Sequence, residues 1–295
     1  MKSLLSVVGP SSVDPQNPLE TSLERRASFW NFARADYQAA YINSTPTLLD
    51  TENLQMWQSC GLQVSATGSL YFDPESLKAD PCYRCSTVQL VSHTLLWILL
   101  RIMNYLASPT QDTAIRQAVW DQLTAQLDAW YACLPVAFQP SARLRHPVSR
   151  QSSLTPGGQN GSRSGISELF FSIPLCAATM QLYHFARIVL LLSKPTQAQL
   201  SSRLQAYREV SAQALQHAHG IVGIALGRPH PAVRVEMLLP LFAAGTCLEA
   251  DEERTLVVEV LRAIELDTGC ATASRVRELE KEWGWEGAGF VPVAA

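Results

Sequence analysis

Three of the chain's six histidines lie in one short segment, HAHGIVGIALGRPHPAVR, at residues 217–234. On a helix, a separation of two residues turns the side chains of His217 and His219 about 200° apart around the axis. Two imidazoles so arranged cannot bind one metal ion together, so this spacing predicts no metal site. We interpret the segment as a helix that ends at Gly227, followed by a turn and a second helix with Pro231 in its first turn.

The cysteines are a second candidate for metal or redox chemistry. Cys82 and Cys85 form a CxxC motif, but a structural zinc site needs four ligands and no second pair follows. A thioredoxin-like redox motif would need a βαβ pattern, which the surrounding sequence lacks. We therefore interpret these residues as packed or incidental thiols, with zinc or redox chemistry as the weaker alternative. The seven cysteines are dispersed, which favours reduced thiols in the cytosol or nucleus.

Polar side chains inside apolar helices are the remaining candidates. A buried histidine or arginine needs a partner, so one interpretation is a hydrogen-bonded contact between helices. The alternative is a small-molecule pocket, and its candidate ligand-binding residues are His93, Trp97, Arg101, His184 and Arg187. No segment matches a catalytic or cofactor-binding motif. We therefore predict no catalytic residue, no cofactor and no metal, and an enzyme is the less favoured class.

The elements that must position these side chains are predicted to be helices. Apolar residues recur at helical spacing, and no segment shows a convincing period of two. The sequence predicts an all-α fold, a single multi-helix domain of regulatory type, with helices near 22–45, 86–107, 112–133, 168–193, 197–226, 231–248, 251–268 and 271–283. We expect Pro240 to kink the helix that contains it. Gly220 and Gly223 should let another helix approach closely.

The segments between the helices differ in character. Residues 46–85 contain turn signals and few periodic runs, so we expect an irregular connection with one short helix at most. Residues 139–167 contain seven Ser, four Gly, three Pro and four Arg but no acidic residue, which predicts a flexible, disordered loop. Residues 1–21 and 286–295 are predicted to be a flexible N-terminus and a C-terminal tail.

Composition limits the possible environments of the chain. Charged residues make up 17% of it, below the roughly 25% of an average globular protein, so much of the chain should be buried. The net charge of −3 provides no overall basic field for nucleic acid. The most apolar segment, Leu90–Ala107, is interrupted by His93 and Arg101, whereas a membrane-spanning helix needs about 20 predominantly apolar residues. We therefore predict a buried core helix and no membrane association.

An ordered series of segments resembles the fungal-specific transcription factor domain, the regulatory region of fungal zinc-cluster transcription factors. Most of the resemblance lies in HAHGIVGIALGRPHPAVRVEMLLPLFAAG, the EER helix start, the IELDTG turn and the RVRELEKEW helix. The segment LYHFARIVLLLSKP resembles the preceding helix of the family, and ASFWNFARADYQAAYINSTPTLLDTENLQMW resembles its N-terminal part. The resemblance covers residues 22–285.

The resemblance implies an all-helical transcriptional regulator of a fungal pathway, with secondary metabolism as one candidate. Its expected location is the nucleus, with the cytoplasm as the alternative. Its expected partners are a small-molecule effector, a protein partner or a second copy of the chain. Members of the family usually begin with a binuclear zinc cluster of six cysteines, and this sequence contains none. We therefore predict no direct DNA contact by this chain and expect a fragment, a truncated product or a regulator that acts through a partner.

Two further function classes stay open, because a fold does not fix a function. The chain could be a stand-alone enzyme or small-molecule-binding protein of a biosynthetic gene cluster, built on the same helical scaffold. It could also be a structural or dimerisation module. Turnover of a metabolite by the purified protein would distinguish an enzyme from a regulator.

Overall fold

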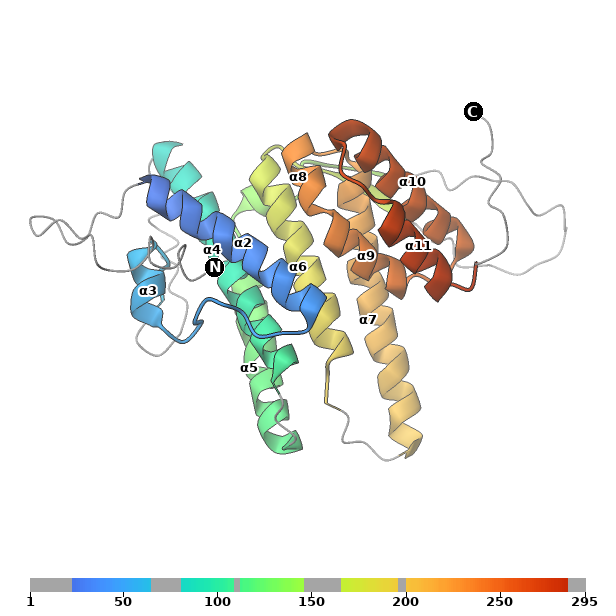
Figure 1. Ribbon diagram of the computed structural model, residues 1–295, viewed down its shortest axis with the longest axis horizontal. Helices are drawn as coiled ribbons and strands as arrows, with labels where there is room; N and C mark the ends of the chain where they lie inside the picture. Colours follow the sequence, from blue (N-terminus) through green and yellow to red (C-terminus); the bar gives the residue numbers. More distant parts are fainter. Residues whose placement is uncertain (1–22, 65–80, 109–111, 146–165, 196–199, 286–295) are drawn as a thin grey trace, which may run out of the picture. The chain divides into compact units, whose positions relative to one another are not determined.

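The computed structural model describes residues 23–64, 81–108, 112–145, 166–195 and 200–285 (Figure 1). These residues belong to two compact units. Unit 1 contains residues 1–135 and 193–197, and unit 2 contains residues 136–192 and 198–295. The predicted N-terminus at 1–21, the tail at 286–295 and most of the loop at 139–167 lie outside the described residues. The side chains of Cys82 and Cys85 do so too, although the backbone there is helical.

The described residues of unit 1 form four α-helices: α2 (Leu23–Asn43), α3 (Leu54–Ser59), α4 (Pro81–Ala107) and α5 (Thr113–Ala132). Helix α4 packs against both α2 and α5. Large aromatic side chains fill the core, among them Phe29, Trp57, Trp97 and Trp130. Helix α3 agrees with the prediction of one short helix at most between residues 46 and 85, but α4 begins at Pro81, inside the segment that was predicted to be irregular. Residues 65–80 of that segment lie outside the described residues.

The loop after α2 is fixed by a buried carboxylate. Asp36 accepts hydrogen bonds from the backbone N–H groups of Leu48 and Leu49, each at 2.9 Å. Because Asp36 is 4% exposed, these bonds satisfy a charge that would otherwise be costly to bury. These bonds fix the backbone of the loop that leads from α2 to residues 50–52. The predicted end of this helix before Pro46 is confirmed.

Helix α5 agrees with the helix predicted near residues 112–133. Asp112 is the N-cap, and its carboxylate accepts from the backbone N–H groups of Ala114 and Ile115. Apolar residues at helical spacing form a stripe from Ile115 to Trp130, and its buried members are Leu123, Leu127 and Trp130. The first residue of that stripe, Ile115, is 54% exposed. The apolar face of α5 therefore extends beyond the packed core.

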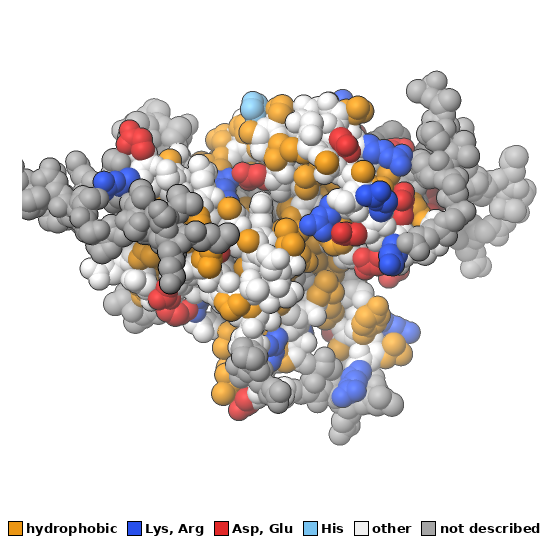
Figure 2. Space-filling model, in the orientation of Figure 1, with side chains coloured by type: hydrophobic (Ala, Val, Ile, Leu, Met, Phe, Trp, Pro, Cys, Tyr) orange, Lys and Arg blue, Asp and Glu red, His pale blue; other side chains and the backbone are white. Residues whose placement is uncertain are grey.

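Unit 2 contains six α-helices in its described residues. They are α6 (Pro174–Leu192), α7 (Leu200–Leu226), α8 (Pro231–Glu236), α9 (Leu238–Cys247), α10 (Asp251–Thr268) and α11 (Ala273–Glu282). Helix α7 packs against α6 and α9, and α11 packs against α9 and α10. Charged side chains gather over α10 and α11 (Figure 2). These two helices therefore bury one face and present a solvated one, as their amphipathic sequences predict.

A short hairpin corrects part of the sequence prediction. Strands β1 (Ala142–Arg145) and β2 (Ser167–Phe170) pair antiparallel, with Ala142 opposite Phe170. The predicted loop at 139–167 therefore contains a strand, and the helix predicted from 168 begins only at Pro174. Four paired residues are too few to show a clear alternation in sequence. The all-α class is confirmed, because the hairpin is a small addition to a helical fold.

The glycines of α7 also meet neighbours that the sequence did not specify. A Cβ on Gly220 would lie 2.7 Å from the His184 ring of α6, which confirms the predicted close approach of a helix there. A Cβ on Gly223 would instead lie 2.3 Å from the carbonyl oxygen of Ser167, and one on Gly227 would lie 2.1 Å from that of Leu169. These two glycines admit strand β2, so the expectation of a neighbouring helix at Gly223 is wrong.

The predicted kink at Pro240 is also wrong. The break falls at Met237, between α8 and α9, and Pro240 occupies the first turn of α9. A backbone N–H in a first turn has no partner within its helix, so proline is tolerated there. Pro231 similarly opens α8, as predicted, and Gly269 ends α10 with a φ of 74°.

Two helices are long and apolar enough to cross a membrane on composition alone, at Thr87–Ala107 and Pro174–Leu192. Within the protein, 67% of the first apolar window and 72% of the second are buried. Core helices of globular proteins have this property. The predicted burial of Leu90–Ala107 is confirmed.

Candidate functional site

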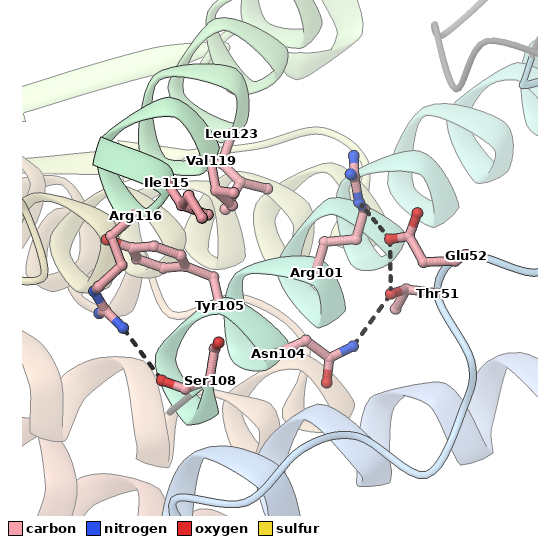
Figure 3. Close-up of a pocket in the computed structure, with 10 residues that line it drawn as sticks. All are labelled: Thr51, Glu52, Arg101, Asn104, Tyr105, Ser108, Ile115, Arg116, Val119 and Leu123. Atoms are coloured by element: carbon pink, nitrogen blue, oxygen red, sulfur yellow. Dashed lines mark hydrogen bonds and ion pairs between the residues drawn. The ribbon is translucent and has the colours of Figure 1, made fainter. Parts of the chain in front are cut away.

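The candidate site is a cavity of about 220 Å³ in unit 1. Its walls are the C-terminal half of α4, the N-terminal half of α5 and the loop that follows Asp50 (Figure 3). Polar and apolar side chains both face it. The lining residues are Thr51, Glu52, Arg101, Asn104, Tyr105, Ser108, Ile115, Arg116, Val119 and Leu123.

Side chains of α4 hold the loop that forms one wall. The indole Nε1 of Trp97 donates to the carbonyl oxygen of Thr51 at 3.1 Å, and the Asn104 amide donates to the Thr51 hydroxyl at 3.1 Å. Asn104 also accepts from the backbone N–H of Thr47 at 2.8 Å. Since these partners come from separate parts of the chain, the loop has a fixed position against α4. The cavity wall is therefore preformed.

Arg101 is the main charged group on this side of the cavity. Its Nη1 donates to the amide oxygen of Gln126 at 2.8 Å, and its guanidinium lies 5.0 Å from the centre of the Trp97 ring. Its Nε lies 3.5 Å from a carboxylate oxygen of Glu52. The Arg101 side chain is 15% exposed and that of Glu52 is 76% exposed. The arginine is thus held in place, whereas its carboxylate partner is largely in solvent.

Arg116 provides a second cation in the lining. Its guanidinium lies 4.6 Å from the centre of the Tyr105 ring, and its Nη1 donates to the carbonyl oxygen of Ser108 at 3.3 Å. The Tyr105 hydroxyl donates to the carbonyl oxygen of Ser193 at 3.1 Å. Burial raises the pKa of Tyr105, and the nearby Arg116 cation opposes that rise. The phenol is therefore neutral at physiological pH.

Apolar side chains of α5 lie between the two arginines (Figure 3). Ile115, Val119 and Leu123 follow one another at four-residue spacing, so they share one face of the helix. Leu123 is buried, Val119 is half-buried and Ile115 is exposed. The cavity can therefore accept a small molecule that has both an anionic group and an apolar part.

The structure separates the three candidate residues that the sequence placed on α4. Arg101 lines the cavity, and Trp97, 1% exposed, supports both Arg101 and Thr51 from beneath. His93 does not line it: its ring stacks on Trp30, with centroids 3.8 Å apart and planes 6° from parallel. Burial, with smaller contributions from Arg34 and Arg26, lowers the pKa of His93 to about 3. His93 is therefore a neutral packing residue.

The other two candidates, His184 and Arg187, belong to unit 2. The Nδ1 atoms of His184 and His217 lie 2.9 Å apart, so one imidazole donates and the other accepts. Burial is the main cause that lowers the pKa of His184 to about 3 and that of His217 to about 4. The Nε of Arg187 donates to the Tyr183 hydroxyl at 3.1 Å. The contact between His184 and His217 matches the predicted polar contact between helices, whereas Arg187 and Tyr183 both belong to α6. A ligand role for His184 and Arg187 stays a prediction.

The two histidines His217 and His219 of α7 contact different helices. His217 meets His184 of α6, whereas the Nε2 of His219 lies 3.0 Å from a carboxylate oxygen of Glu253 in α10. The two imidazoles thus lie on different faces of α7, as their spacing predicts. In the part of the chain that the structure describes, no group of three or more His, Cys, Asp or Glu residues could hold a metal ion.

The chain is similar to part of a transcription activator. Over 301 aligned residues it is 33% identical to the transcription activator AMTR1 of Alternaria alternata. The similarity covers 93% of this chain and 38% of that protein, so the chain spans well under half of its relative's length. No family model matches the sequence. No solved structure matches it either.

Sequence reasoning missed most of the cavity lining. Thr51 and Glu52 lie in a segment that was predicted to be irregular, and Asn104 and Ser108 carry no motif. The signal that could have found the site lies on α5. The apolar stripe there begins at Ile115, next to Arg116. An apolar stripe that begins beside a cation is a pattern typical of an amphipathic binding surface.

Proposed function

We propose that this chain is the regulatory part of a transcriptional regulator. One observation carries the proposal: similarity to a transcription activator extends along 93% of the chain. The all-helical fold and the ordered series of segments that resemble the fungal-specific transcription factor domain support the same class. Since the chain covers 38% of its relative, the role that we assign is that of a module.

The proposal has three finer parts. The chain acts in the nucleus, it controls genes of a fungal pathway, with secondary metabolism as the leading candidate, and it responds to a small molecule or a protein partner. The preformed cavity of unit 1 favours the small molecule, because a fixed pocket binds at a lower entropic cost than one that must be ordered.

A fusion experiment tests the regulatory role. Residues 1–295 are joined to an unrelated DNA-binding domain and expressed in a fungal host with a reporter gene under that domain's operator. We expect reporter transcript to change relative to the DNA-binding domain alone. An unchanged transcript level, with the fusion present in the nucleus at equal abundance, would contradict the proposal.

A second measurement separates a regulator from an enzyme. The purified chain is incubated with extracts of its pathway, and metabolites are followed by mass spectrometry. A regulator leaves every metabolite unchanged beyond stoichiometric binding. Catalytic consumption of one metabolite would replace the proposed role with the alternative of an enzyme built on the same helical scaffold.

A further inference from the structure

The cavity of unit 1 contains an apolar surface that its own helices leave uncovered. Along α5, the stripe that is buried at Leu123 and Leu127 continues to Val119 and Ile115, and Ile115 is 54% exposed. Exposed apolar area at the mouth of a concave, preformed site is typical of ligand binding.

The cation beside this surface is only loosely neutralised. Trp97 and Gln126 fix Arg101, and its Nε has a contact of 3.5 Å to a carboxylate that is itself 76% exposed. A strong arginine–carboxylate pair is bidentate, with two parallel bonds of about 2.8 Å. The same carboxylate oxygen accepts from the Thr51 hydroxyl, also at 3.5 Å. Because both contacts of the Glu52 carboxylate are long and its side chain is largely in solvent, another carboxylate can replace it at little cost.

We propose that the cavity binds a short-chain organic monocarboxylate. The ligand carboxylate displaces Glu52 and forms a bidentate pair with Arg101, and its apolar part lies on Val119 and Ile115. Arg116 lies beyond that apolar surface, so the lining carries two cations and one displaceable anion, a balance that favours an acid over an amine. The volume of about 220 Å³ is below the 300–1,000 Å³ of drug-sized sites, which sets the small size.

This inference goes beyond the regulatory role, because binding is a property of the folded chain itself. The cavity can bind an acid whether or not the chain controls transcription. The outcome of the reporter fusion experiment therefore does not test whether the cavity binds an acid. The test that follows measures binding to the purified chain only, so its failure leaves the proposed function standing.

The binding test uses hexanoate as the probe, measured by calorimetry on residues 1–295. Hexanamide has the same apolar part without the charge, and acetate has the charge without the apolar part. We expect hexanoate to bind at least about tenfold more tightly than either, because a charge-assisted bidentate pair and the apolar contact act together. Equal binding of hexanoate and hexanamide, or no binding of hexanoate, overturns the proposal.

Four variants locate the site. Arg101→Gln should weaken hexanoate binding by about tenfold or more, and Arg101→Lys by less, because lysine keeps the charge but loses the fork. Glu52→Gln should strengthen binding by about threefold, because it removes the competing carboxylate. Val119→Phe should abolish binding by filling the apolar part of the cavity.

The control is Arg208→Gln, which removes an exposed arginine from α7 and should leave the affinity unchanged. Circular dichroism reports whether each variant folds. If Arg101→Gln fails to fold, Glu52→Gln and Val119→Phe decide the matter, since Glu52 is exposed and Val119 is half-buried. Weaker or unchanged binding in Glu52→Gln overturns the displacement of Glu52 by the ligand.

Discussion

At the scale of single residues, unit 2 shows how a glycine and a histidine pair depend on each other. Gly220 and His217 are three residues apart on α7, so both meet the same region of α6. His184 fills that region, and its hydrogen bond to His217 fixes the ring. A side chain at position 220 would have to push the ring away and break the bond.

We therefore predict that Gly220→Ala destabilises the protein by about 1–2 kcal/mol, even though alanine favours helix by about 1 kcal/mol. Urea unfolding measures the change, with Gln213→Ala on the exposed face of α7 as the control. In a His184→Ala background the same substitution should cost less, or even stabilise. An equal cost in both backgrounds would show that the ring is not the obstacle.

The buried histidines predict how stability depends on pH. The folded-state pKa values of His93, His184 and His217 are about 3, 3 and 4, below the ordinary value of 6.5. Below pH 6.5 the unfolded chain therefore binds more protons than the folded protein. The free energy of unfolding has its full value above that pH and falls as the pH decreases towards 4. Each such histidine contributes a slope of up to about 1.4 kcal/mol per pH unit.

Urea unfolding between pH 7 and pH 5 tests this dependence. His93→Gln should reduce the pH dependence of the free energy of unfolding by the contribution of one histidine. Leu123→Ala destabilises the core without removing a titrating group, so its curve should run parallel to that of the unmodified chain. A slope that His93→Gln leaves unchanged would show that the pKa of His93 is the same in the folded and the unfolded chain.

At the scale of elements, the sequence predicted helices well and their neighbours poorly. The helices predicted near 112–133 and 251–268 depend on residues within one or two turns, so local patterns specify them. The approach of β2 to Gly223 depends on residues more than fifty positions apart, which no local pattern encodes. The break at Met237 was assigned to Pro240, because a proline pattern alone does not say whether the residue lies inside a helix or in its first turn.

The residues of the cavity also differ in how well the sequence predicts them. Arg101 was found because a charge interrupts an apolar run. Glu52 was missed because a charged residue in an irregular segment has no distinguishing pattern. Its position depends on hydrogen bonds from Trp97 and Asn104 to the neighbouring Thr51, over long sequence separations.

The end of α10 gives a prediction at this scale. Gly269 has a φ of 74°, and no atom lies within 4 Å of a Cβ built there. The cost of a side chain is therefore conformational alone. We expect Gly269→Ala to destabilise by about 1 kcal/mol and Gly269→Asn by less, because asparagine tolerates left-handed backbone. Thermal unfolding measures both. Equal costs would indicate a steric clash in place of backbone strain.

At the scale of the whole molecule, each unit has a core of its own. Leu127 of α5, in unit 1, and Ile221 of α7, in unit 2, are both fully buried. The chain passes between the units at residues 135–136, 192–193 and 197–198. A separate core in each unit predicts that each can lose its packing without the other.

Hydrogen exchange measured by mass spectrometry tests this independence. Leu127→Ala should cost about 2–5 kcal/mol and speed exchange in α4 and α5, while α7 and α9 keep their protection. Ile221→Ala should have the opposite pattern. If either variant speeds exchange equally in both units, the molecule unfolds as one cooperative body, and binding at the cavity of unit 1 would then stabilise α7 and α9 as well. If the units are independent, protection by the ligand stays within unit 1.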